Sequence, residues 1–158
     1  MKKITLFLIC LLAAPLLQAQ DFEPQGIIKY RQAVMTSIKG HNLAIKQIVS
    51  GKFPDHGQIP KHVEALGNLF GELDTLFPEG SDFGKTNAKD AIWDNPEKFA
   101  ATIKKARAAY QTFKAAAGSN DHKAIGKALK VFGKGSCGAC HKSFKKKPKK
   151  INALQASA

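Results

Sequence analysis

The stretch IPKHVEALGNLFGELDTLF, residues 59–77, has an apolar residue at every third or fourth position. The repeated positions are Ile59, Val63, Leu66, Phe70, Leu73 and Phe77, and Pro78 follows them directly. Because an α-helix turns once in about 3.6 residues, this spacing places one apolar seam along one helix face. We therefore predict a helix that begins near Pro60, ends before Pro78 and buries its seam against other helices.

Three further segments share this helical spacing, and strand-like alternation is almost absent. They span about residues 24–50, 95–117 and 120–147, and each is bounded by glycine, proline or a capping residue. Residues 79–91 are rich in Gly, Asp and Asn and predict a crossover loop. The pattern predicts an all-α protein folded as an antiparallel four-helix bundle, in which cofactor sites lie between facing helices.

The first residues have the features of a secretory signal peptide. Lys2 and Lys3 precede an apolar run from Ile4 to Leu17, and the run is shorter than the roughly 20 residues that cross a bilayer. We predict cleavage after Ala19, which makes residues 1–19 a signal peptide and residues 20–158 one periplasmic domain. No membrane insertion is expected once the signal is removed.

The net charge of the chain is +13, and much of the excess is near the C-terminus. Six lysines occupy the segment 142–150 and predict a Lys-rich C-terminal tail. A lysine run of this kind is usually a solvated face, and an exported chain is not expected to bind nucleic acid. Docking to an acidic redox partner protein is the alternative, and that partner stays unidentified.

Two cysteines remain after removal of the signal, which contains Cys10, and both belong to CGACH, residues 137–141. Cys-X-X-Cys-His is the signature of c-type haem attachment. Cys137 and Cys140, about one helical turn apart, can add to the two vinyl groups on one porphyrin edge. His141 then becomes the proximal ligand of the iron. The motif predicts one covalent haem c.

Two other readings of the motif compete with haem. A thioredoxin-like Cys-X-X-Cys is expected near a βαβ pattern, whereas this motif ends an all-α chain. A structural zinc site requires four ligands, and the only histidine nearby is His122. Both alternatives are weaker than haem attachment.

The first predicted helix has polar residues on its apolar stripe of Ile27, Val34, Ile38, Ile45 and Ile48. Arg31 and His41 occupy steps of this stripe. A buried arginine needs a partner for its charge, and a haem propionate would be one. The alternative is an arginine that extends to solvent at the bundle edge. Met35, one turn after Arg31, could be a sixth iron ligand, a cover for the distal face, or core filler.

The remaining histidines and two aromatic residues receive no functional assignment. The histidines are His41, His56, His62 and His122, each interpreted as a surface or core residue rather than an axial ligand. Tyr110 and Trp93 are interpreted as packing residues.

Three segments of the chain resemble the cytochromes c prime, the class II c-type cytochromes. KYRQAVM, residues 29–35, is similar to the family's first-helix haem segment, and AIW, residues 91–93, to its motif before the third helix. CGACH, residues 137–141, lies near the C-terminus as in that family, whereas mitochondrial-type cytochromes c carry it near the N-terminus. The resemblance covers nearly the whole mature chain.

The resemblance implies a set of residues around the haem. Arg31 and Gln32 would lie at the haem edge, Arg31 near a propionate, and Met35 would occupy the distal position. Three crossover-loop residues align loosely with other haem-edge contacts: Thr86, Asn87 and Lys89. One departure is that the family commonly has an arginine shortly after the haem-binding histidine, where this chain has Lys142, Lys145, Lys146 and Lys147. Lysine supplies charge without the planar donor fork of arginine.

The function that the resemblance implies is not enzymatic. The expected protein is a redox-active periplasmic cytochrome with one five-coordinate, high-spin haem iron that binds small gases such as NO and CO, carries electrons, or both. The alternative is a low-spin, six-coordinate electron carrier with His141 and Met35 as iron ligands. The resemblance also implies a homodimer.

Overall fold

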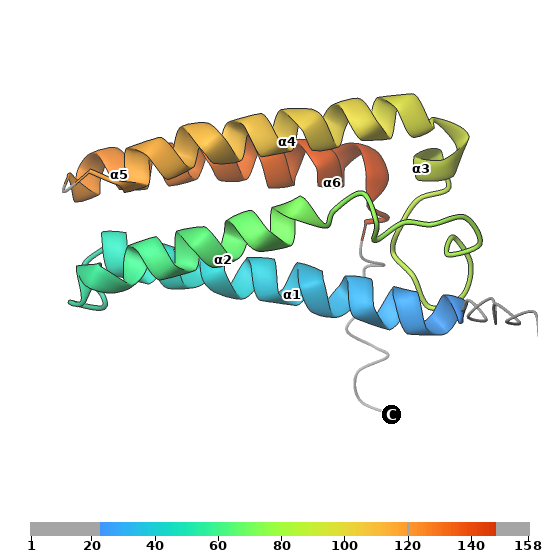
Figure 1. Ribbon diagram of the computed structural model, residues 1–158, viewed down its shortest axis with the longest axis horizontal. Coiled ribbons are helices and arrows are strands. Elements are labelled where there is room, and N and C mark those ends of the chain that lie inside the picture. Colours follow the sequence, from blue (N-terminus) through green and yellow to red (C-terminus); the bar gives the residue numbers. More distant parts are fainter. Residues whose placement is uncertain (1–22, 120, 148–158) are drawn as a thin grey trace, which may run out of the picture.

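The computed structural model describes residues 23–119 and 121–147, and within them it is an all-α bundle (Figure 1). The elements are α1 (Pro24–Val49), a 3₁₀ turn η1 (His56–Gln58), α2 (Ile59–Gly71), α3 (Ala91–Asp94), α4 (Pro96–Ala117), α5 (His122–Phe132), a π-helical segment η2 (Gly133–Gly138) and α6 (Ala139–Phe144). The predicted signal peptide and the end of the lysine-rich tail lie outside the described residues. No helix within 23–119 and 121–147 is long and apolar enough to span a membrane.

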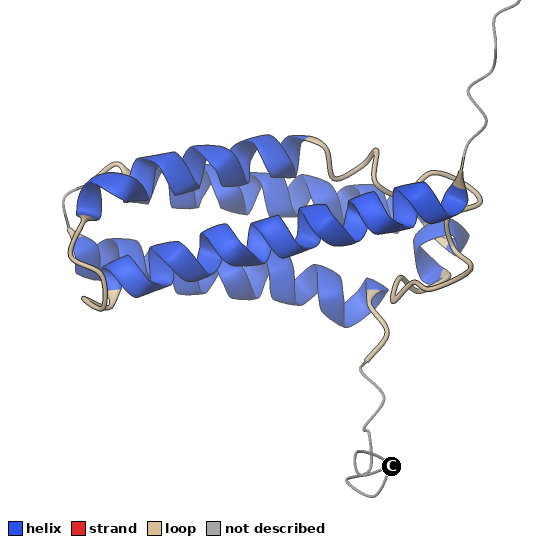
Figure 2. Ribbon diagram, turned by 90° about the horizontal axis from the view of Figure 1, so that it is seen from below, coloured by secondary structure: helices blue, strands red, loops and turns tan. Residues whose placement is uncertain are grey.

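Four long rods form the bundle, and successive rods run antiparallel (Figures 1 and 2). The rods are α1, α2, α4 and the continuous run from α5 through η2 to α6. The predicted antiparallel four-helix bundle is therefore confirmed. The predicted fourth helix is present from His122 to Phe144, so it ends three residues before the predicted end. At its glycines it contains a π segment, in which each hydrogen bond spans five residues instead of four.

The apolar seams meet in one core. Phe132 stacks on Phe113 of α4 with ring centroids 5.2 Å apart, and it also contacts Tyr110 of α4 and Phe70 of α2. Burial of such large aromatic side chains contributes most of the apolar stabilisation of a small bundle. The predicted seams of the second and third helices are thus confirmed as core, except for Phe77, which is half-buried and packs against it.

The stripe of α1 differs from the prediction at its start. Ile28 is buried and Ile27 is half-buried, so the stripe begins one residue later than predicted. Ile28, Arg31 and Val34 follow one another at steps of three residues, which keeps all three on the face of α1 that packs on the bundle.

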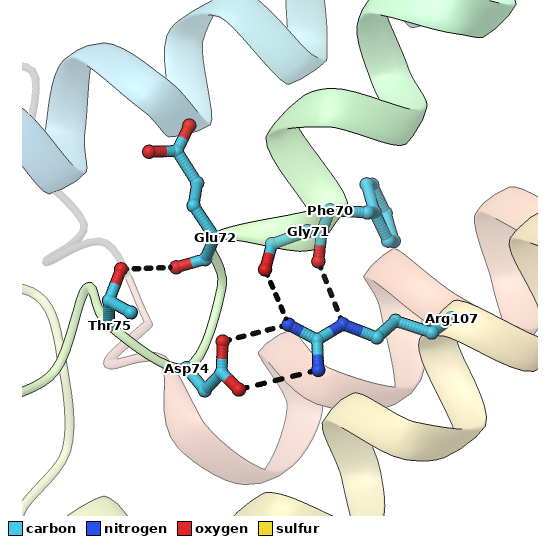
Figure 3. A network of polar contacts seen from close by, with 6 residues as sticks. All are labelled: Phe70, Gly71, Glu72, Asp74, Thr75 and Arg107. Carbon is cyan, nitrogen blue, oxygen red and sulfur yellow. Dashed lines mark hydrogen bonds and ion pairs between the residues drawn. The ribbon is translucent and has the colours of Figure 1, made fainter.

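The prediction for the end of the second helix was wrong, because α2 stops at Gly71, well before Pro78. Arg107 of α4 donates hydrogen bonds to the carbonyl oxygens of Phe70 and Gly71, at 3.0 and 2.8 Å (Figure 3). It also forms a bidentate ion pair with Asp74, at 2.7 and 3.3 Å. These contacts satisfy carbonyls that a helix end leaves unpaired, so a side chain from a distant helix caps α2.

Residues 72–90 connect α2 to α3, and they still contribute to the core. Leu73 and Leu76 are buried although they are no longer helical. The segment crosses the end of the bundle at which α1 begins (Figure 1). The predicted crossover loop is therefore longer on its N-terminal side than residues 79–91, because it starts where Arg107 ends α2.

Candidate functional site

The two cysteines of CGACH lie where the last rod changes from π-helical to α-helical geometry. Cys137 belongs to η2 and Cys140 to α6, and both are free thiols, half-buried against the hydrophobic core. Burial raises the pKa of Cys137, and burial together with the nearby Cys137 raises the pKa of Cys140 to about 11. Both sulfurs are therefore held as thiols on the inner side of the helix.

His141 follows Cys140 on α6 and is exposed. Desolvation by the surrounding protein and the charge of Lys145 hold the pKa of His141 below its ordinary value. The neutral imidazole is the form that binds a metal ion. His141 thus presents an available nitrogen donor directly after the two thiols.

The segment before Cys137 leaves room and one unsatisfied polar atom. A Cβ added at Gly133 or Gly135 would meet nothing within 4 Å. Ser136 is buried, and its Oγ has no hydrogen-bond partner among the described residues. Two inward thiols, an available imidazole, open space and an orphaned hydroxyl within the segment 133–141 fit a covalently attached haem.

Arg31 of α1 is 4% exposed, so the alternative of an arginine that extends to solvent is wrong. Its guanidinium donates to the carbonyl oxygens of Leu76 and Ser81, at 3.1 and 3.0 Å, and to the hydroxyls of Ser81 and Thr86, at 3.0 and 2.8 Å. Arg31 therefore binds the crossover loop and holds it on α1. The propionate contact implied by the family resemblance stays a prediction.

Two aromatic rings flank this guanidinium. Its central carbon lies 4.7 Å from the ring centroid of Phe77 and 5.9 Å from that of Trp93. The indole of Trp93 also donates to the carbonyl oxygen of Pro78, at 3.0 Å. Cation–π contacts of this kind partly offset the desolvation that lowers the pKa of Arg31.

The other predicted haem-edge residues join the crossover loop to α1 and to the helix that carries CGACH. Gln32 donates to the carbonyl oxygen of Lys85, at 2.8 Å. The backbone of Lys89 donates to the carbonyl oxygen of Phe144, and that of Lys146 to the carbonyl oxygen of Asn87.

Ala88 and Lys145 form an antiparallel bridge between the same two segments. The side chain of Lys89 also donates to the carbonyl oxygen of Lys142, at 3.2 Å, one residue after His141. The structure thus brings the start of α1, the crossover loop and the CGACH helix together at one end of the bundle. Whether these residues contact a haem stays a prediction.

Met35 is half-buried and packs against the same core cluster as Cys137 and Cys140. This places the predicted distal residue on α1, on the inner face of the bundle, without assigning it to iron. Its role as sixth ligand, distal cover or filler is therefore still open to experiment.

Two serines at this end of the bundle are buried, and sequence reasoning assigned a role to neither. Ser81 lies in the polar crossover loop, where no pattern singles it out, yet it is fully buried and bonded to Arg31. Ser136 did carry a signal, because it occupies a step of the apolar stripe that continues from Leu129 and Phe132.

The zinc alternative has no ligand set in the described part of the chain. Across residues 23–119 and 121–147, no three His, Cys, Asp or Glu side chains converge to hold a metal ion. Structural zinc usually requires four such ligands.

Comparison with known proteins identifies the family. The family model described as cytochrome c′ matches residues 26–145. The chain is 34% identical to cytochrome c′ of Rhodospirillum rubrum over 128 residues, covering 80% of this chain and 86% of the relative.

Solved structures give the same result. Cytochrome c′ of Rubrivivax gelatinosus superposes with a TM-score of 0.70 at 32% identity, covering 78% of this chain and 98% of the other. Cytochrome c′ of Alcaligenes xylosoxidans superposes with a TM-score of 0.71 at 30% identity, covering 80% and 98%, in a ferrous arginine-to-lysine variant with bound NO. Another variant of that protein has bound carbon monoxide. The family model matches most of this chain, and both thiols of CGACH are placed to bind a porphyrin. The chain therefore belongs to the cytochrome c′ family, and its cofactor is covalent haem c.

Proposed function

We propose that this chain is a periplasmic mono-haem cytochrome with a five-coordinate, high-spin iron that binds NO and CO, carries electrons, or both. His141 would hold the iron from the proximal side, and Cys137 and Cys140 would hold the porphyrin. The observation that carries the proposal is the inward placement of both thiols against the same core that Met35 packs against. Haem supplies the redox-active iron and its gas-binding position.

The chain's own residues would restrict what reaches the iron. Met35 and the core side chains that it packs against are apolar. Polar, hydrogen-bonded ligands such as dioxygen gain from distal donors, whereas NO and CO bind ferrous haem without them. We therefore expect neutral gases to be preferred and strong peroxidase activity to be absent, in line with the gas-bound forms of the Alcaligenes protein.

Residues of the crossover loop would shape the haem edge. Arg31 uses both terminal nitrogens in four hydrogen bonds to the protein, which leaves its Nε as the donor for a propionate. Gln32, Thr86, Asn87 and Lys89 lie on the segments that Arg31 joins, and we assign them to the same edge.

A second candidate function is supported by the half-burial of Met35 in the cluster that contains both cysteines. If the Met35 sulfur binds the iron, the protein is a low-spin His/Met electron carrier with no open iron position. The two candidates therefore predict different spectra and different gas binding.

The deciding experiment is an optical spectrum of the oxidised and reduced holoprotein, alone and with NO or CO, for the wild type and Met35→Leu. Five-coordinate iron predicts a high-spin ferric spectrum in both proteins and gas binding by the wild type. A low-spin wild type that becomes high-spin in Met35→Leu would establish the six-coordinate alternative. A colourless protein from a host competent in cytochrome maturation would refute both.

Export and assembly are tested separately. The mass of the secreted protein should equal residues 20–158 plus one haem, and Cys137→Ser with Cys140→Ser should lack the haem. Light scattering after size exclusion should give the mass of a homodimer, and the mass of a monomer would contradict that proposal.

A further inference from the structure

Two histidines outside the haem site meet between the first two helices. His41 lies on α1 and His62 on α2, which run side by side (Figure 1). Their Nδ1 atoms are 2.9 Å apart, and both side chains are half-buried. The rings are tilted by 54°, with centroids 5.2 Å apart. His41 is also the polar residue on the α1 stripe that the haem site does not explain.

One proton alone can occupy the space between these two nitrogens. A hydrogen bond requires Nδ1–H on one ring and a lone pair on the Nδ1 of the other. If both rings carried the proton on Nε2, two lone pairs would lie beside each other at this distance. A divalent cation to one side of the line between the nitrogens would bind both after a small rotation of each ring, and the shared proton would move through solvent to Nε2 of its own ring.

The distance between the two nitrogens determines which coordination geometry a bound ion could have. With metal–nitrogen bonds of about 2.0–2.1 Å, nitrogens 2.9 Å apart subtend about 90° at the metal. That is the angle between neighbouring ligands of a square-planar or tetragonal site, whereas tetrahedral zinc needs a wider angle. Tetragonal geometry with imidazole donors favours Cu²⁺, which also binds most tightly among the divalent first-row metals.

We propose that His41 and His62 form a Cu²⁺ site that joins α1 to α2, with water as the remaining ligands. Each helix holds one imidazole close to the other, so binding requires a change of tautomer and ring rotation but no movement of the helices. Because α1 and α2 contribute one ligand each, the ion would be bound by the folded protein and much less by the unfolded chain.

The charges around His62 have two opposite effects on the binding of a cation. Burial, and then the charges of His41 and Lys61, lower the pKa of His62, which favours the neutral ring that a metal requires. Lys61 also repels a cation, but its side chain is exposed and water and salt screen it.

A second histidine pair serves as an internal control. His56 and His122 stack with ring centroids 3.5 Å apart and ring planes within 9°. The lone pairs of parallel stacked rings point along parallel lines rather than toward a common point. This pair contains the same residue types and is not expected to bind one metal ion through both rings.

The test uses the untagged mature holoprotein, copper(II) chloride and isothermal titration calorimetry in a buffer that does not bind copper. The wild type should bind one Cu²⁺ per chain. His41→Gln and His62→Gln should each weaken binding at least tenfold, and the double variant His56→Gln/His122→Gln should match the wild type. Equal affinity in all proteins, or a loss confined to the control variant, would overturn the proposal.

Electron paramagnetic resonance on the wild type gives a readout that does not depend on any variant folding. At one equivalent, the copper signal should show a tetragonal site with two imidazole nitrogens, separate from the haem signal. One imidazole nitrogen or none at the first equivalent would also overturn the proposal. Haem absorbance and the metal-free thermal midpoint verify that each variant is folded.

Discussion

Replacing Arg31 by methionine removes the guanidinium that joins α1 to the crossover loop while keeping an unbranched apolar side chain of similar length. Arg107→Met is a matched control because Arg107 also donates four hydrogen bonds, two of them to carbonyl oxygens. The two arginines differ in burial: Arg31 is 4% exposed, whereas the side chain of Arg107 is 37% exposed.

The difference in burial sets the expected free energies. Without Arg31, the carbonyl oxygens of Leu76 and Ser81 lose their donor in a region where both residues are fully buried. Each unsatisfied buried acceptor costs about 1–3 kcal/mol, and removal of a desolvated cation returns part of that cost. We expect Arg31→Met to lower the free energy of unfolding by about 3 kcal/mol.

The control should cost less because three of its four hydrogen bonds have exposed acceptors, where water can replace the lost donor, and only the carbonyl of Phe70 is part-buried. Gly71 and Asp74 are exposed, and an exposed ion pair contributes at most about 1 kcal/mol. We expect Arg107→Met to lower the free energy of unfolding by about 1 kcal/mol.

Urea denaturation of the holoprotein, followed by circular dichroism, measures both values. With a slope near 1.5 kcal/mol per molar urea, the midpoint should fall by about 2 M for Arg31→Met and by less than 1 M for Arg107→Met. Equal shifts in the two variants would refute the reasoning that burial of the acceptors, rather than the number of hydrogen bonds, decides the cost.

Three further changes test local features of the bundle. Gly67→Ala places a methyl group against the buried Tyr110 hydroxyl, and thermal denaturation should show a loss of about 1–3 kcal/mol. Asp121→Ala removes the side-chain cap of two backbone N–H groups at α5, which should cost about 1 kcal/mol in the same assay. The hydrogen bond from Arg107 and its charge lower the pKa of Asp74, so wild type should exceed Asp74→Asn in stability above about pH 4, and the difference should vanish as pH falls through the lower folded-state pKa. A difference that instead grew on acidification would contradict the last expectation.

Local patterns in the sequence were sufficient for the helices, the bundle and the cofactor. The seam from Ile59 to Phe70 and its counterpart on α4 predict buried helix faces, because periodicity alone determines which residues share a face. CGACH predicts haem attachment because the two thiols and the imidazole lie within five consecutive residues. Chemistry contained in one short segment can be predicted without knowing its neighbours.

Contacts between distant segments could not be predicted in this way. The helical pattern continues to Phe77, yet α2 ends at Gly71 because Arg107, on another helix, binds its last carbonyls. The stripe of α1 places Arg31 on an apolar helix face but shows neither its burial nor the groups that satisfy it, and these proved to be crossover-loop atoms about 45–55 residues away.

His41 and His62 show most directly the difference between what local sequence determines and what tertiary packing determines. Taken singly in the sequence, His41 and His62 are ordinary histidines on two amphipathic helices. Only the packing of α1 on α2 brings their Nδ1 atoms to 2.9 Å. The sequence by itself determined the helices and the haem motif, since both depend on residues close along the chain. Tertiary structure decided the helix ends, the partners of buried charges and the meeting of the histidines, since those depend on which surfaces pack together.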